Sequence, residues 1–189
     1  MISDRNMEQQ AQLVRRSQAG DRSAFERLFE AHRDRVFGLL WRQLDDRETA
    51  EELTVETFVR AWERLPGLAA PEAFPLWLRQ IAVNLARDAL RRRSRQPVAS
   101  DLPDVAENQP DPARAGDRIM QDELTHEINR ALAGLPDHYR EVAVLHYLDD
   151  QPVKSIADVL SIPVGTVLSR LARARDQLRR KLSAYVEGA

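Results

Sequence analysis

Cysteine is absent from this 189-residue chain, and its absence excludes disulfide bonds, zinc–thiolate sites and thiol catalysis. Long apolar runs are lacking too. No stretch approaches the length of a membrane span and no signal-peptide pattern opens the chain, so we expect a cytoplasmic protein without direct membrane insertion. Glycine is scarce, at seven residues, whereas Ala, Leu, Arg and Glu are abundant, and this composition favours helices.

Signatures of catalysis are also missing. The four histidines share no metal-ligand spacing, and the chain contains no phosphate-binding or dinucleotide-binding glycine motif. We therefore expect no catalytic residue, no metal and no cofactor, and a protein that is not an enzyme.

The charge is small in total but unevenly distributed. A formal net charge of −2 by itself argues against a nucleic-acid binder. However, residues 79–95 carry six basic side chains against one acid, and so do residues 166–182. Residues 96–125, between them, carry seven acids and two arginines. Two basic segments separated by an acidic one indicate local phosphate contacts on a chain that is not basic overall.

Apolar residues recur with helical periodicity along most of the chain, and no strand pattern is convincing, so the predicted fold class is all-α. We expect two small helical modules, at 1–95 and 122–189. Residues 96–121 combine four prolines with acids and small residues and few large apolar side chains. This composition predicts a flexible linker rather than an ordered loop.

Three features organise the first module. Ser23 with Glu26 is typical of a capping box, which Asp21 could assist, at the start of the first periodic helix. An Asp pair marks a break before a second helix at about 48–65. A loop follows, and then a helix at about 76–93 that carries the first basic segment.

The helix at 48–65 has an unusual outer face. Its inward face is lined by Ala50, Leu53, Thr57, Ala61 and Leu65 when residues are placed at 100° intervals. Val55 and Val59 then lie on the outer side among glutamates, which suggests a partner surface with apolar anchors and an acidic rim. The alternative is that these are two of the scattered exposed valines common on protein surfaces.

The end of the second module has the pattern of a helix-turn-helix. A short helix at about 152–160 and a tight turn precede a long basic helix at about 163–185. Thr166, Ser169 and Arg170 project away from its apolar face, and Arg173 does the same, so hydroxyl and guanidinium groups could reach phosphates and base edges in a major groove. The alternative is a solvated face on an ordinary helical hairpin.

Four blocks, in order and spacing, resemble sigma factors of the extracytoplasmic-function (ECF) group of bacterial RNA polymerase. They are AGDRSAFERLFEAHRDRVFGLLWRQL, TAEELTVETFVRAWERL, FPLWLRQIAVNLARDALRRRSR and ALAGLPDHYREVAVLHYLDDQPVKSIADVLSIPVGTVLSRLARARDQLRRKL. The stretch SIPVGTVLSRLARAR is highly specific. The resemblance covers all but the linker and the two tips, and it includes only the family's conserved regions two and four.

The resemblance implies a transcription initiation factor that binds core RNA polymerase, directs it to promoters and assists promoter melting. The helix at 48–65 would dock on the clamp helices of the β′ subunit, with the β subunit as a further contact. The loop and helix at 65–93 would capture the −10 element, and the helix-turn-helix would read the −35 element. An anti-sigma factor is a further partner that the resemblance implies.

The residues implied fall into three sets. The polymerase-binding set is Glu48, Glu52, Val55, Glu56 and Val59; the −10 set is Phe74, Arg79, Asn84, Arg87, Arg91 and Arg92; and the −35 set is Thr166, Leu168, Ser169, Arg170 and Arg173.

Two other classes of protein remain as alternatives. A helix-turn-helix regulator could bind DNA alone and use its first module for dimerisation or sensing, in which case it would not need the outer face of 48–65. An adaptor of stacked helices that does not bind DNA is disfavoured by the two basic helices.

Overall fold

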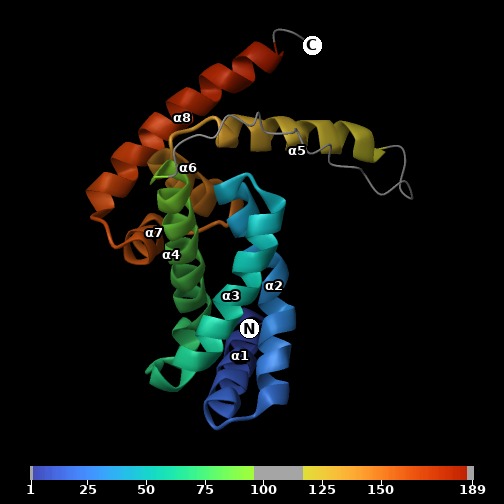
Figure 1. Cartoon of the computed structure of the whole chain (residues 1–189), viewed down its shortest axis with the longest axis vertical. Helices are drawn as coiled ribbons and strands as arrows, with labels where there is room; N and C mark the ends of the chain where they lie inside the picture. The colour runs from blue at the N-terminus through green and yellow to red at the C-terminus, as the bar shows by residue number, and fades with distance from the viewer. Residues whose placement is uncertain (1, 96–116, 187–189) are drawn as a thin grey trace.

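The computed structural model describes the backbone of residues 2–95 and 117–186, and the side chains of residues 7–95 and 125–183. Every regular element within these ranges is helical, which confirms the all-α prediction (Figure 1). The α-helices are α1 (Ile2–Gln18), α2 (Arg22–Leu44), α3 (Arg47–Arg64), α4 (Phe74–Arg95), α5 (Asp117–Ala133), α6 (Asp137–Ala143), α7 (Val153–Leu160) and α8 (Val164–Val186), with short helical turns η1 (Leu65–Gly67), η2 (Pro71–Ala73) and η3 (Val144–Leu148).

Most of the predicted linker, 96–116, lies outside the described residues. Residues 117–121 do not, and they form the first part of α5, so the linker prediction is wrong at that end. The reason is local composition. The last proline of the segment is Pro112, and the residues from Asp117 onward include Ile, Met, Gln, Glu and Leu, which a helix accommodates well.

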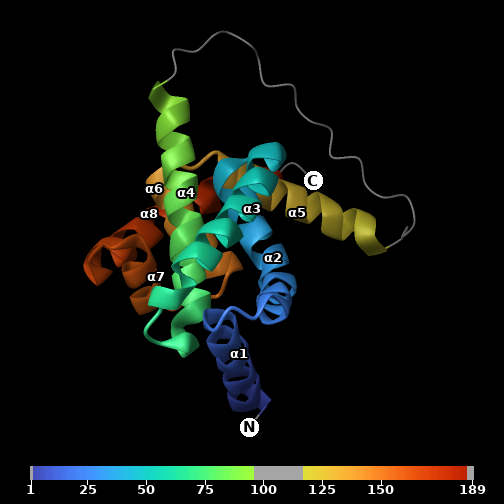
Figure 2. The same ribbon diagram turned by 60° about the horizontal axis from the view of Figure 1, so that its bottom comes forward.

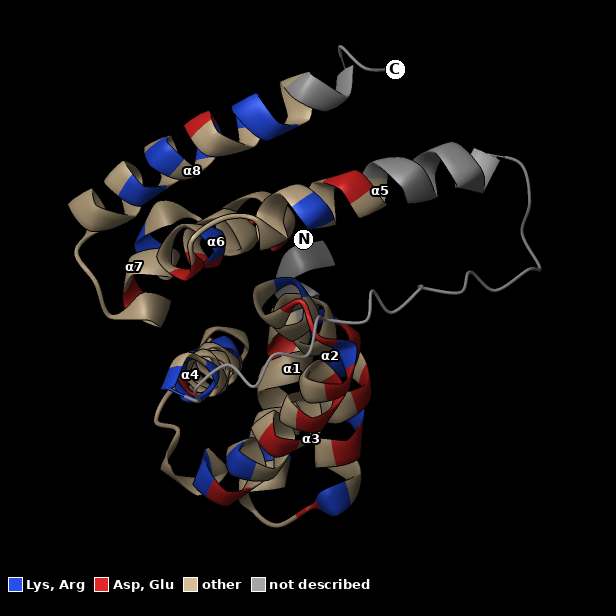
Figure 3. Ribbon diagram, turned by 45° about the horizontal axis from the view of Figure 1, so that its top comes forward, with Lys and Arg blue, Asp and Glu red and all other residues tan. Residues whose placement is uncertain are grey.

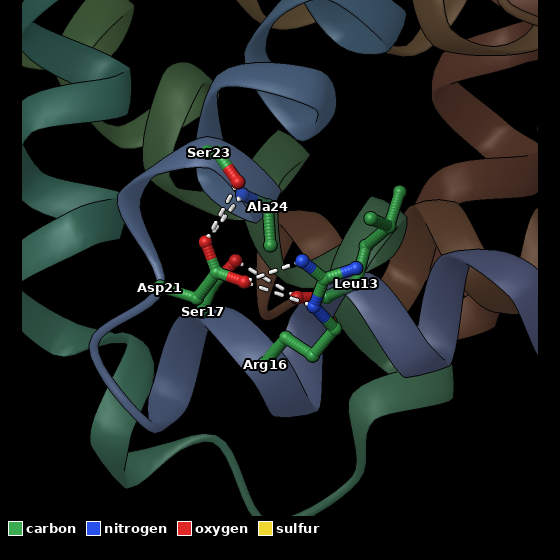
Figure 4. Close-up of polar contacts among 6 residues, drawn as sticks. All are labelled: Leu13, Arg16, Ser17, Asp21, Ser23 and Ala24. Atoms are coloured by element: carbon green, nitrogen blue, oxygen red, sulfur yellow. Dashed lines mark hydrogen bonds and ion pairs between the residues drawn. The ribbon is translucent and has the colours of Figure 1, made fainter.

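The start of α2 is capped two residues earlier than the sequence indicated (Figure 4). Asp21 is the N-cap, and its Oδ1 accepts hydrogen bonds from the Ala24 amide at 3.1 Å and the Ser23 hydroxyl at 2.8 Å. Its Oδ2 accepts from Arg16 Nε at 2.9 Å. The Ser23 hydroxyl, then Arg16 and the Ala24 amide, lower the pKa of Asp21 to about 2. The predicted Ser23–Glu26 box is wrong because an ionised carboxylate is a stronger acceptor at a helix N-terminus than a hydroxyl.

Helix α1, which the sequence analysis did not single out, packs along α2 (Figures 1 and 2). Ala11 and Val14 are fully buried in this contact. At its end, Gln18 Nε2 donates to the backbone oxygens of Leu65 at 3.0 Å and Leu68 at 2.8 Å. These bonds hold the loop after α3 in place before α4 begins.

Helix α4 is buried on two sides. Phe74, Leu78, Ile81 and Leu85 recur at helical spacing and form one buried stripe. Val83 lies on a different face and is also fully buried, as are its neighbours Ala82 and Ala86. The contacts explain both stripes, because α4 packs against α2 and α3 on one side and against α7 on the other. The helices before and after the gap therefore share one continuous core.

Helices α5 to α8 meet around Arg140 of α6. Its guanidinium donates to the oxygens of Leu132 at 3.1 Å, Ala133 at 2.6 Å and Leu135 at 3.0 Å, and so satisfies the carbonyls at and just beyond the end of α5. It also donates to the oxygen of Gln43 in α2 at 2.8 Å. The buried Arg140 guanidinium thus links α2, which precedes residues 96–116, to the end of α5, which follows them.

Among the described helices, none is by itself both long and apolar enough to cross a membrane. Only α7 and α8 counted together meet those criteria, and the chain bends by 107° between them.

His32 of α2 is buried between α1 and α4. Its Nε2 is 3.0 Å from Gln10 Oε1, and its ring centre is 5.5 Å from that of the buried Phe74. Burial, followed by the positive charges of Arg35 and Arg79, lowers the pKa of His32 to about 4 from an ordinary value of 6.5. The imidazole is therefore neutral in the folded protein at neutral pH.

We predict that His32 makes the protein less stable in mild acid. Because its pKa is lower folded than unfolded, the free energy of unfolding falls as pH drops from about 6.5 and the loss is complete below about 4. The gap between the two pKa values corresponds to about 3 kcal/mol. Urea denaturation across this window should show a steeper loss for the wild type than for His32→Gln. Parallel curves for the two proteins would contradict the assignment.

We also predict that Phe74 is a core residue whose loss is felt in folding. Phe74→Ala should lower the free energy of unfolding by about 3–5 kcal/mol, because it leaves a cavity under α4. Phe37→Ala is the matched control, since that ring is only partly buried and stacks on Trp41 at 6.2 Å. Chemical denaturation followed by circular dichroism measures both, and equal losses would contradict the difference in burial.

Candidate nucleic-acid interface

The outer face of α3 presents the two valines that the sequence analysis placed there. Val55 is 59% exposed and Val59 is 46% exposed, whereas Leu53 and Thr57 on the opposite side are buried. Asp46 begins the helix by accepting from the Thr49 amide at 3.1 Å, which fixes the phase of these residues. The predicted orientation is therefore confirmed.

Acidic residues lie along α3 (Figure 3), and several of them flank the exposed valines on the helix surface. Glu48 and Glu52 are exposed, and Glu51 and Glu63 add to the rim. Glu56 is partly buried and accepts from Arg60 Nε at 2.7 Å, so its charge is already paired. The face as a whole is apolar at two points and acidic around them, and it suits a partner with apolar pockets and basic groups.

Helices α7 and α8 form the helix-turn-helix. Ser161 adopts a left-handed conformation with φ of 53°, and the Ile162 amide returns to the Ala157 oxygen at 3.1 Å, so the turn closes α7 and redirects the chain. Pro163 precedes the first residue of α8 and accepts from the Thr166 amide at 2.9 Å. The bend of 107° lies within the range typical of DNA-binding helix-turn-helix units.

The first three turns of α8 carry the predicted reading residues on an open face. Val167, Leu171 and Ala174 are buried against the rest of the module. Leu168 is 53% exposed. The other members of the set are exposed or half-buried: Thr166, Ser169, Arg170 and Arg173. The Ser169 hydroxyl donates to the Thr166 oxygen at 3.0 Å, within the helix.

Sequence reasoning missed one residue of this face. Val164 begins α8 and is 44% exposed, next to Gly165 and close to Leu168 along the helix. The available signal was an apolar side chain at the first position of the helix, beside a glycine and a threonine. Together with basic residues along the rest of α8 (Figure 3), it gives the helix an apolar tip and a cationic body.

The predicted DNA-binding residues of α4 differ in their exposure and in their ion pairing. Asn84 and Arg92 are exposed, and Arg91 is exposed but pairs with Asp88 on the same helix. Phe74 is fully buried, so it cannot contact a base in this conformation, and we withdraw it as a DNA-binding residue. The signal was misleading because Phe74 is the only aromatic residue within the stretch 66–75, but it packs inward as the first residue of α4.

The other two arginines of the predicted −10 set pair with carboxylates from the helices after residue 116. Arg79 pairs with Asp149, with Nη2 to Oδ1 at 3.3 Å, and both side chains are mostly buried. Arg87 makes a two-pronged contact with Glu141 at 2.7 and 3.0 Å and also donates to the oxygen of Leu160 at 3.1 Å. Neither carboxylate was predicted as a partner from the sequence, because they lie 70 and 54 residues away along the chain.

Comparisons with known proteins match the two parts of the chain to two regions of one family. The family description Sigma-70 region 2 matches residues 28–96, and Sigma-70, region 4 matches residues 125–178. We call these parts of the chain region 2 and region 4. The chain is 30% identical to the ECF RNA polymerase sigma factor SigW of Bacillus subtilis over 176 residues, which cover 89% of this chain and 94% of SigW. It is 31% identical to the RNA polymerase sigma-H factor of Pseudomonas aeruginosa, with coverage of 96% and 98%.

Solved structures show the same fold. CnrH, in complex with the cytosolic domain of CnrY, has a TM-score of 0.67 at 24% identity and covers 93% of this chain and 98% of its own. The sigma factor RpoE of Bartonella quintana, in complex with the anti-sigma factor NepR, also has a TM-score of 0.67, at 20% identity, with coverage of 84% and 96%.

The two regions match in the family's order, and the relatives align over nearly their whole length. Together with the open basic face of the helix-turn-helix, these matches show that the chain belongs to the ECF group of RNA polymerase sigma factors.

Proposed function

We propose that the chain, a transcription initiation factor by family, divides promoter recognition among three helices. In this proposal α3 docks on the clamp helices of the polymerase β′ subunit, α4 binds and helps to melt the −10 element, and α8 reads the −35 element. The observation that carries it is the open face of α8, where hydroxyl and guanidinium groups project from a helix-turn-helix whose apolar side is fully packed.

The chemistry of each face supports its assignment. Arginine donates two parallel hydrogen bonds to guanine O6 and N7, and exposed apolar side chains can contact the thymine methyl group. Arg170 and Arg173 supply the first kind of group and Val164 and Leu168 the second. On α3, two exposed valines within an acidic rim supply apolar anchors for a basic protein partner.

The domain boundaries and the setting are part of the proposal. The modules are 1–95 and 122–189, with the start of α5 at Asp117 as an extension of the second. As a polymerase subunit without catalytic work of its own, the protein would act in the cytoplasm. The similarity to RpoE, whose solved complex contains the anti-sigma factor NepR, supports an anti-sigma factor as a further partner.

Substitution of the α3 valines tests polymerase docking. Val55→Asp with Val59→Asp should weaken binding to core polymerase at least tenfold, about 1.4 kcal/mol, because two charges would be buried in an apolar contact. Helix content should not change, since both side chains already face solvent. Binding is measured by fluorescence anisotropy of the labelled full chain against core polymerase.

Val164→Asp is the matched control, because it makes the same change at an exposed valine of α8 and should leave polymerase affinity intact. Unchanged affinity for the folded α3 variant would overturn the docking assignment.

Arginine substitutions in α8 test base reading. Arg170→Ala or Arg173→Ala should relax the preference at one −35 position, since a bidentate arginine–guanine contact discriminates by about 1–3 kcal/mol. Promoter selection from a randomised library by the variant holoenzymes measures the preference. Arg180→Ala, three turns further along α8, should at most weaken all promoters alike. If neither arginine alters any preference, α8 is not the reading helix.

A further inference from the structure

We propose that region 4 holds the chain closed by presenting Glu141 and Asp149 to the two α4 arginines, as substitutes for the phosphates of −10 DNA. This inference rests on the proposed role of α4. The contacts Arg79–Asp149, Arg87–Glu141 and Arg87–Leu160 are called the clasp below.

The Arg87 part of the clasp has the geometry of phosphate recognition. Two guanidinium nitrogens meet the two oxygens of Glu141 at 2.7 and 3.0 Å, which is the parallel arrangement that arginine also uses with phosphate. The side chain of Glu141 is only 6% exposed and that of Arg87 is 23% exposed. A third nitrogen donates to the last carbonyl of α7, at Leu160, so the hydrogen-bonding capacity of Arg87 is largely used within the chain.

The Arg79 part lies two turns earlier on the same side of α4. Arg79 and Asp149 are 16% and 15% exposed. The pair borders a hollow of about 490 Å³ that is also lined by Arg35 and Arg42 of α2. This hollow leaves the Arg79–Asp149 pair open to solvent and ions on one side.

Between the two arginines, the surface of α4 is covered by region 4. Val83 is four residues from each arginine and therefore lies on the same face. It is fully buried, and α4 packs against α7 along this stretch. A DNA strand could reach Arg79 and Arg87 only if region 4 moved away, so the closed chain cannot use both arginines for DNA.

The closed arrangement is also too compact to read two promoter elements at once. Elements named −10 and −35 are roughly 25 base pairs apart, about 85 Å of duplex at 3.4 Å per base pair. Arg87 of the −10 helix lies within hydrogen-bond distance of Leu160, the last residue of α7 and four residues before α8. The whole of α8, at 23 residues, spans only about 35 Å. The clasp must therefore open before one chain contacts both elements.

The outer face of α3 is not involved in the clasp. Val55 and Val59 remain exposed while the clasp is closed. Polymerase can thus dock on the closed chain, and phosphates then compete with Glu141 and Asp149 for the α4 arginines. Free protein would bind −10 DNA weakly, because only the open fraction of molecules is competent.

The distance between regions 2 and 4 in the full chain tests the clasp. The chain has no cysteine, so spin labels attach only at Glu63→Cys and Arg179→Cys, which replace exposed residues of α3 and α8. Double electron–electron resonance should give one short distance for the parent protein. Glu141→Gln with Asp149→Asn should raise the ratio of open to closed molecules at least tenfold, since a mostly buried arginine that loses its charged partner disfavours the closed state.

Two further variants make the result specific. Asp158→Asn with Asp176→Asn removes the same charge from exposed positions of region 4 outside the clasp, and should stay closed. Arg79→Gln with Arg87→Gln removes the clasp from the α4 side and should open to the same extent, which covers the case in which the buried Glu141 substitution disturbs region 4 itself. Closed distances in both clasp variants would overturn the proposal.

A random-sequence duplex of 40 base pairs, added at low salt, tests competition by phosphate. It should open the parent chain, and no change in its distance would contradict the phosphate-mimic role. Run-off transcription separates this inference from the proposed function. If the clasp variants open but Arg87→Ala holoenzyme melts promoters normally, the result supports the clasp and contradicts the proposed −10 role of α4.

Discussion

The packing of α4 on two sides is the constraint on which the rest of the structure depends. One stripe of this helix, with Phe74 and Leu78, completes the core of region 2, and the opposite stripe, with Val83, supports region 4. A helix buried on both sides leaves little surface for solvent. The polar side chains that remain near the second stripe must therefore find partners inside the protein.

Charge pairing follows from that burial. Arg79 and Arg87 could not lie at a packed boundary without anions, and region 4 supplies Asp149 and Glu141. Buried pairs of this kind contribute little net stability, because desolvation offsets most of the attraction, but they penalise any other partner arrangement. They therefore specify one relative placement of the two regions, and an apolar contact alone would tolerate small rotations. Arg140 acts in the same way with backbone carbonyls from both α5 and α2.

The same pairing reconciles the composition of the chain with its family. The net charge is −2, although we propose that two basic helices, α4 and α8, contact promoter DNA. In the closed arrangement, two of the basic side chains of α4 are neutralised internally, and the basic residues of α8 remain exposed. Internal pairing of this kind reduces the electrostatic attraction of the free chain for DNA, because fewer unpaired cations face the phosphates.

Periodicity and local turn chemistry determined much of this protein from the sequence alone. They indicated an all-helical chain, the outward Val55 and Val59, and the helix-turn-helix with Arg173 on its open face, because each depends on residues a few positions apart. Local errors, at the Ser23 box and at residues 117–121, arose where two adjacent signals competed. Tertiary structure alone decided that Phe74 points into the core and that Arg79 and Arg87 face carboxylates 70 and 54 residues away. A basic stripe on a helix has the same spacing whether its partner is a phosphate or a distant carboxylate, so only the packing of region 4 on α4 could distinguish the two.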